Sequence, residues 1–175
     1  DGEILVEVHY MSLDPYMRGR MNDEVSYSPP VALGGVMVGS AVGRVVASKH
    51  PDYAVGDTVC GGVGWQEYGL TTGGGFEKVD ENRAPLSAFL GVLGMPGLTA
   101  YFGFLDICEP KEGDTVFVSG AAGAVGALVG QLGKIRGCRV VGSAGTDEKC
   151  HHLIEECGYD AAFNYKTDPD FLAII

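Results

Sequence analysis

The first half of the chain alternates polar and apolar residues over short stretches. This period of two is typical of half-buried strands. It predicts strands at residues 3–10, 36–49, 57–60 and 65–71. Gly39 and Gly43 lie inside the second of these segments, and glycines inside a strand indicate bulges or close backbone approach. Residues 61–64 (GGVG) are too rich in glycine for a regular strand. We therefore expect residues 1–86 to form a small, irregular β-barrel.

From residue 87 the pattern changes to helical stretches separated by short apolar runs. Gly94-Met95-Pro96-Gly97 predicts a break between two helices, because proline cannot continue a helix. The apolar runs predict buried strands at 115–119, 138–142 and 160–165, with helices between them at 123–136 and 146–158. Thr146 is expected to cap the second of these helices, with acidic residues in its first turn. This order predicts an α/β domain over residues 87–175, namely the first half, with three parallel strands, of a doubly wound sheet.

The turn between the first of these strands and its helix carries the strongest chemical signal. It reads SGAAGAVG from Ser119 to Gly126, which matches G-x-G-x-x-G with Ala121 in the first position. Gly123 would let the backbone approach a pyrophosphate at the helix N-terminus, and Gly126 would let helix and strand pack closely. We predict that the turn binds a dinucleotide. The alternative is a glycine-rich turn without a ligand.

The segment after the second strand indicates which dinucleotide. An NAD site of this type has a carboxylate there, which holds the ribose 2′-hydroxyl. Residues 141–145 read VGSAG and contain no acid. Asp147 is better explained as a first-turn residue of the next helix. Lys149 is close enough in sequence to pair with a 2′-phosphate, its alternative being a solvated helix lysine. The sequence therefore predicts NADPH rather than NADH.

Composition excludes several classes of function. Twelve Lys and Arg against 23 Asp and Glu give a net charge of −11, which disfavours binding to nucleic acid. No apolar run reaches the ~20 residues of a membrane-spanning helix. The five cysteines form no C-x-x-C pair, so we expect reduced thiols and a cytoplasmic protein rather than disulfides or a zinc ribbon. Cys150-His151-His152 would point in different directions on a helix, so we expect a solvated helix face and no metal.

Four short segments of the chain together form a sequence signature that resembles a known family. They are DPYMRGRM at 14–21, GMPGLTAY at 94–101, the turn at 119–126 and NYKT at 164–167. With them the chain resembles the prostaglandin reductase branch of the zinc-independent medium-chain dehydrogenase/reductases, which includes leukotriene-B 12-hydroxydehydrogenases, plant double-bond reductases and bacterial curcumin reductases. The resemblance implies a GroES-like barrel followed by a Rossmann domain. It also implies NADPH-dependent reduction of a carbon–carbon double bond conjugated to a carbonyl, in substrates such as 15-keto-prostaglandins, enals or enones. The catalytic Cys, G-H-E string and four-Cys lobe of zinc-dependent relatives do not occur in this sequence.

The resemblance also implies site residues. The cofactor-binding candidates are Ala122, Gly123, Ala124, Val125, Gly126, Gly142, Lys149 and Tyr165. Within this set the resemblance assigns residues 122–125 to the diphosphate, and Lys149 and Tyr165 to the 2′-phosphate. Tyr16 matches a candidate proton donor, its alternative being a tyrosine that packs at the barrel mouth. Gly62 and Val63 match a substrate-lining stretch of some relatives, through an alignment that crosses a gap.

The predicted strands supply only half of the usual six-stranded doubly wound sheet. Residues 171–175 are apolar and carry no helix stop signal. We therefore expect a longer protein, in which later segments complete the substrate cleft and the contact of a homodimer. Two alternatives stay open: a quinone oxidoreductase or enoyl-thioester reductase of the same superfamily, and a non-catalytic NADPH-binding relative.

Overall fold

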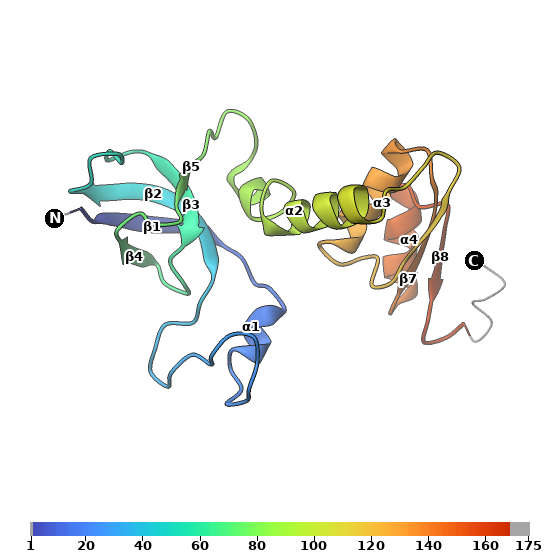
Figure 1. Ribbon diagram of the computed structural model, residues 1–175, viewed down its shortest axis with the longest axis horizontal. Helices are drawn as coiled ribbons and strands as arrows, with labels where there is room; N and C mark the ends of the chain where they lie inside the picture. Colours follow the sequence, from blue (N-terminus) through green and yellow to red (C-terminus); the bar gives the residue numbers. More distant parts are fainter. Residues whose placement is uncertain (1, 169–175) are drawn as a thin grey trace. The chain divides into compact units, whose positions relative to one another are not determined.

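The computed structural model of the protein describes residues 2–168 (Figure 1). The chain divides into two compact units, Asp1–Leu90 and Gly91–Ile175, and each is described by itself. The apolar segment 171–175 lies outside the described residues. No helix within residues 2–168 combines the length and the apolar character needed to cross a bilayer.

The first unit is built on one antiparallel sheet with the strand order β4-β1-β2-β3-β5. Its strands are β1 (Ile4–Met11), β2 (Ser40–Ser48), β3 (Thr58–Gly62), β4 (Tyr68–Thr71) and β5 (Glu77–Lys78). Two short helices accompany them, α1 (Tyr16–Gly19) and the 3₁₀ helix η1 (Leu86–Leu90). The four predicted strands are confirmed, although β2 and β4 each begin a few residues later than the pattern indicated.

The predicted irregularity of this sheet lies where β1 meets β2. The pairing shifts register between Leu5 and Val6 and again between Val8 and Tyr10. Gly43 of β2 lies so close to β1 that a side chain there would collide with the carbonyl oxygen of Glu7. This close approach requires glycine, as the sequence pattern indicated.

One strand boundary was predicted wrongly. Gly61 and Gly62 belong to β3, where they pair with Ala41 and Ser40 of β2. The reason is a tertiary contact: the ring of the buried Phe76 lies over Gly61, and a Cβ there would stand 2.5 Å from its Cγ. The aromatic ring supplies the packing that glycine lacks, so a glycine-rich segment continues the strand.

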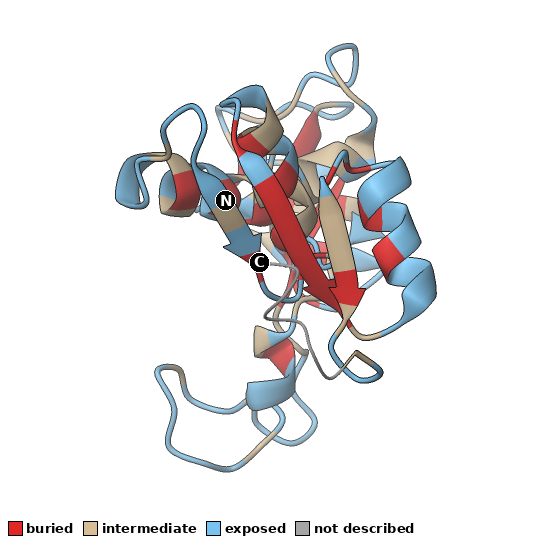
Figure 2. Ribbon diagram, turned by 90° about the vertical axis from the view of Figure 1, so that its right-hand side faces the viewer, coloured by how far each residue is buried: buried red, intermediate tan, exposed pale blue. Residues whose placement is uncertain are grey.

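The second unit contains a parallel sheet with the order β6-β7-β8, which confirms the predicted half of a doubly wound sheet. Its elements are α2 (Met95–Tyr101), the π-helix η2 (Phe102–Ile107), β6 (Thr115–Val118), α3 (Gly126–Ile135), β7 (Arg139–Ala144), α4 (Asp147–Glu155) and β8 (Ala161–Asn164). Figure 2 shows β7 as the buried middle strand. Val140 on β7 and Leu153 on α4 are fully buried in its core.

The predicted break between two helices exists, but it lies at residues 91–94, between η1 and α2, rather than at 94–97. Helix α2 begins at Met95, and Pro96 lies in its first turn, where a residue without an N–H costs nothing. Gly97 is needed because any side chain there would collide with the carbonyl oxygen of Val92. Proline therefore starts this helix instead of interrupting it.

Burial corrects two further expectations. β6 was predicted as a buried strand, yet Phe117 is 44% exposed, because β6 is an edge strand within the described residues. The helix face at Cys150 was predicted to be solvated, and this holds only for His151 and His152. Cys150 itself is buried in the core of the second unit.

Candidate functional site

The glycine turn after β6 is anchored to the neighbouring strand. Gly120 has a φ of +59°, in the left-handed region that favours glycine. The amide of Ala121 donates a hydrogen bond of 3.0 Å to the carbonyl oxygen of Ser143 on β7. The Ala121 methyl is fully buried, and a Cβ on Gly142 would stand only 2.8 Å from it. Alanine in the first motif position is thus accommodated because Gly142 opposes it.

Helix α3 begins where the turn ends, at Gly126. A Cβ on Gly126 would stand 2.7 Å from the carbonyl oxygens of both Gly120 and Ala121, so only glycine fits without displacing the turn. The first amides of any α-helix have no acceptor within the helix and carry the positive end of its dipole. Gly123 and Ala124, which precede them, are exposed. The turn therefore presents exposed backbone at a helix N-terminus, which suits a phosphate group. The amides of Gly123, Ala127 and Leu128 already donate to carbonyl oxygens of the turn.

A cavity of about 330 Å³ adjoins this turn. Three segments line it: the turn after β6, the turn between β7 and α4, and the residues after β8. The lining residues are Gly120, Ala122, Gly123, Ala144, Gly145, Thr146, Lys149, Tyr165 and Lys166. The fold thus brings the predicted residues Ala122, Gly123, Lys149 and Tyr165 to one place, although the first and the last of them are 43 positions apart in the sequence.

The cavity is cationic, and its lining contains no acid among residues 2–168. Lys149 and Lys166 are exposed, and they are the charged residues of the lining. The amide of Lys149 donates to Thr146 Oγ1 at 3.3 Å, which confirms the predicted cap of α4. Lys166 was missed, although it directly follows Tyr165 and the signal was therefore present in the string NYKT. Two cations at one cavity of an acidic chain favour a dianionic group such as a phosphate monoester.

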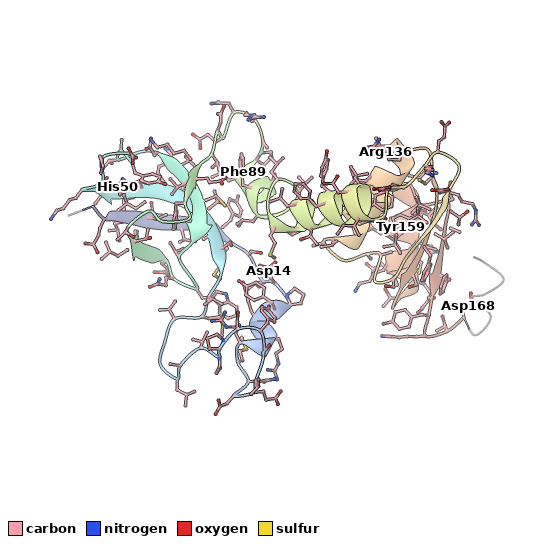
Figure 3. All side chains as sticks on the ribbon, in the orientation of Figure 1. Asp14, His50, Phe89, Arg136, Tyr159 and Asp168 are labelled. Atoms are coloured by element: carbon pink, nitrogen blue, oxygen red, sulfur yellow. The ribbon has the colours of Figure 1, made fainter. Side chains whose placement is uncertain are left out.

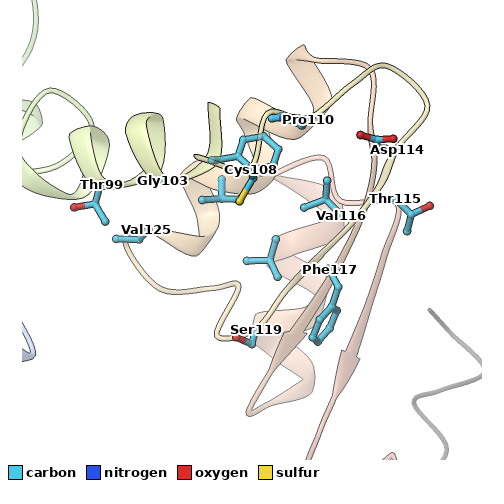
Figure 4. Close-up of a pocket in the computed structure, with 13 residues that line it drawn as sticks. Thr99, Gly103, Cys108, Pro110, Asp114, Thr115, Val116, Phe117, Ser119 and Val125 are labelled. Atoms are coloured by element: carbon cyan, nitrogen blue, oxygen red, sulfur yellow. The ribbon is translucent and has the colours of Figure 1, made fainter. Parts of the chain in front are cut away.

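The other predicted cofactor residues lie around the turn. Val125 lines a second, larger cavity of about 640 Å³ beside the edge of β6 (Figure 4). Ser119 and Thr99 line it too, the latter from the string GMPGLTAY. Gly126 and Gly142 are buried behind the turn, while Ala124 is exposed and lines neither cavity. The same turn thus contributes to both cavities.

The remaining predicted residues belong to the first unit. Tyr16 is half-buried on α1, and burial raises the pKa of its phenol, helped by the nearby carboxylate of Asp14. Gly62 is exposed at the end of β3. Val63 is buried in the core of the sheet, and its carbonyl oxygen accepts a hydrogen bond of 2.6 Å from Gln66 Nε2.

Comparisons with known proteins show which families and enzymes the chain resembles in sequence. Residues 1–79 match the family described as the N-terminal domain of oxidoreductase. The NADPH-dependent curcumin reductase of Escherichia coli is 56% identical over 168 residues, which cover 96% of this chain and 49% of that protein. Rabbit (Oryctolagus cuniculus) prostaglandin reductase 1 is 49% identical over 170 residues, covering 95% of this chain and 46% of that protein. The chain is thus similar over nearly its whole length to curcumin, alkenal and prostaglandin reductases, as the resemblance of its sequence implied.

Solved structures support the same family. The crystal structure of CurA from Vibrio vulnificus in complex with NADPH superimposes with a TM-score of 0.92 at 47% identity, covering 99% of this chain and 51% of that chain. The quinone oxidoreductase of Escherichia coli complexed with NADPH reaches a TM-score of 0.72 at 21% identity over 95% of this chain and 51% of that chain, which shows the shared fold alone. The chain spans about half the length of the prostaglandin and curcumin reductases that it matches.

Proposed function

We propose that the protein is an NADPH-dependent reductase of carbon–carbon double bonds conjugated to a carbonyl. The observation that carries this proposal is the cavity beside the glycine turn, where Lys149 and Lys166 gather and no acid of the described part of the chain lines the wall. The names of the relatives support the substrate class, since they include a 2-alkenal reductase of Nicotiana tabacum, 47% identical over 175 residues.

The residues of the second unit fit the proposed cofactor. Gly126 keeps the turn open, because a Cβ at this position would strike two carbonyl oxygens. We assign the diphosphate to the turn backbone at residues 122–125 and the N-terminus of α3. Lys149, Lys166 and Tyr165 would surround the 2′-phosphate. When bound, NADPH would supply the hydride that enters the β-carbon of the double bond.

Tyr16 is the proposed source of the proton that completes the reduction. A tyrosine phenol is protonated at neutral pH, which is the form that a general acid needs. Gly62 and Val63 stay proposed substrate-lining residues. Since the Val63 side chain is buried and its carbonyl is engaged by Gln66, Gly62 has the freer backbone of the two.

We also propose that the active protein is a cytoplasmic homodimer. The dimer rests on resemblance to the family. The location rests on the cysteines, because all five are unpaired thiols, three of them buried, as in proteins of reducing compartments. Light scattering of the purified protein and its location in fractionated cells test the two statements separately.

The test of the function is a panel of enones, enals, quinones and 15-keto-prostaglandins assayed for oxidation of NADPH. We expect turnover with the conjugated carbonyl compounds, and a strong preference for NADPH over NADH. Turnover with quinones alone would favour a quinone oxidoreductase. Tight NADPH binding without any turnover would favour a non-catalytic relative. Lys149→Ala should raise the KM for NADPH and leave that for NADH unchanged.

A further inference from the structure

Asn164, the last residue of β8, links the two cationic walls of the smaller cavity. Its side-chain Nδ2 donates a hydrogen bond of 2.7 Å to Oδ1 of Asp147, in the first turn of α4. Its Oδ1 accepts a hydrogen bond of 3.1 Å from the backbone amide of Lys166. Both ends of one amide are therefore used, one on the helix that carries Lys149 and one on the segment that carries Lys166.

Asp147 is the acid that directly follows the lining residue Thr146, and it does not itself line the cavity. Its carboxylate is engaged by the neutral amide of Asn164. The next acid, Glu148, lines an adjoining depression with His151 and His152, and this depression shares Ala122 and Lys149 with the cavity. A carboxylate at the ribose of a dinucleotide holds a 2′-hydroxyl and repels a 2′-phosphate. The position of the Asp147 carboxylate thus bears directly on which cofactor the cavity admits.

We propose that Asn164 is a specificity-determining positioning residue that holds the Asp147 carboxylate away from the cavity and fixes the backbone of Lys166 at its rim. The inference rests on the proposed NADPH-dependent function, whose cofactor choice it explains. Without the amide, the Asp147 side chain is free to turn toward Thr146 and Lys149. It would then neutralise the lysine and oppose a phosphate, while leaving a 2′-hydroxyl unaffected or better held.

The test compares the dissociation constants of NADPH and NADH, measured by cofactor fluorescence on the full protein. For Asn164→Ala we expect NADPH binding to weaken about 3- to 5-fold, as for an exposed charge interaction, with NADH binding unchanged or tighter. The double variant Asn164→Ala/Asp147→Asn should recover most of the NADPH affinity. A purely structural role of Asn164 would weaken both cofactors equally and would not be rescued by Asp147→Asn.

Two matched controls sharpen this experiment. Asn164→Ala/Glu148→Gln removes a charge from the same helical turn without touching the Asn164 contact, so it should not restore NADPH binding. Asn82→Ala breaks another exposed amide–carboxylate pair, Asn82 to Asp80 at 2.9 Å, in the other unit, and should not change cofactor preference.

The outcomes separate the two proposals. If the unaltered protein binds NADPH no better than NADH, the proposed cofactor and this inference both fall. If the unaltered protein prefers NADPH and Asn164→Ala keeps that preference, the inference alone is overturned. Should Asn164→Ala fail to fold, the isosteric Asn164→Asp replaces it. The new carboxylate still accepts a hydrogen bond from the Lys166 amide, but it repels the carboxylate of Asp147. We therefore expect a larger loss of NADPH preference, which Asp147→Asn should reverse.

Discussion

The phenol of Tyr159 donates a hydrogen bond of 2.7 Å to the carbonyl oxygen of Gly126, the first residue of α3. Tyr159 is 3% exposed and is labelled in Figure 3. Burial raises the pKa of this phenol far above its ordinary value, so it stays a neutral donor. Its ring fills a notch left by two glycines, Gly130 on α3 and Gly142 on β7, where a Cβ would meet the ring. A residue before β8 thus fixes the start of the helix that follows the glycine turn.

Gly130→Ala should destabilise the protein, because the added methyl would collide with the Tyr159 ring. We expect a loss of about 1–3 kcal/mol in the free energy of unfolding, as for other overpacked cores. The same substitution in a Tyr159→Ala background should cost much less. Thermal unfolding of the four proteins in this cycle measures the coupling. Gly103→Ala, which meets nothing within 4 Å, is the control. Equal costs in both backgrounds would contradict the packing argument.

Gly126→Ala should weaken NADPH binding more than it lowers stability. Its Cβ would push on the carbonyl oxygens of Gly120 and Ala121 and so displace the turn. A displacement that costs about 1–2 kcal/mol of binding energy corresponds to a loss of roughly 5- to 30-fold in affinity. Fluorescence titration with NADPH measures it. Gly74→Ala, at an open position in the other unit, should bind as the unaltered protein does. Undiminished affinity of the Gly126 variant would argue against the turn as the diphosphate site.

Asp160 should give the protein an acid-sensitive contribution to stability. Its carboxylate accepts hydrogen bonds from Lys134 Nζ at 2.7 Å and from the Val140 amide at 2.6 Å. These bonds, that from Lys134 foremost, lower the pKa of Asp160 below its ordinary 3.8. A lowered folded-state pKa means that the stabilisation is present above the unfolded-state pKa and is lost as the pH falls through the folded one.

We therefore expect Asp160→Asn to cost stability at neutral pH and progressively less as the pH falls through the lowered folded-state pKa, below which the carboxylate is protonated in both states. Because the side chain is 37% exposed, solvent screening limits the effect to about 0.5–1 kcal/mol. Urea unfolding at a series of pH values measures the difference between the two proteins. A difference that stays constant across the series would contradict the assignment.

Tyr16→Phe should lower kcat for enone reduction and leave the affinity for NADPH unchanged. General acids contribute on the order of 10²–10⁴ to rate, so a loss of about 100-fold is the minimum expected if Tyr16 donates the proton. Steady-state kinetics with a fixed enone measure it, and Tyr10→Phe on β1 is the control. An unchanged kcat would leave Tyr16 with a packing role at the first unit's surface.

Local pattern was sufficient to predict most strands and helices and the glycine turn. The turn is local chemistry: the positive φ of Gly120 and the closeness of Gly126 to residues 120 and 121 involve neighbours within six positions. The cap of α4 by Thr146 was predictable for the same reason, since the bond spans three residues. The acid-free segment after β7 likewise indicates a phosphate-tolerant site from residue type alone.

Most of the structural predictions that were wrong concerned residues whose contacts lie far away in the sequence. Gly61 and Gly62 continue β3, and the ring of the distant Phe76 packs over Gly61. Pro96 differs, since its position in the first turn of α2 follows a local rule: proline suits the start of a helix as well as it disrupts the interior.

The sequence by itself determined the alternation of elements, the form of the glycine turn and the acid-free stretch at residues 141–145, because backbone propensity and residue type act locally. Only the tertiary structure decided which side chains meet: Tyr159 with Gly126, 33 positions away, and Asn164 with Asp147, 17 positions away. The second contact forms because the parallel strands β7 and β8 bring their carboxyl ends to one edge of the sheet, whatever their separation in the chain. The cationic cavity is a property of that edge, and neither Lys149 nor Lys166 reveals it alone.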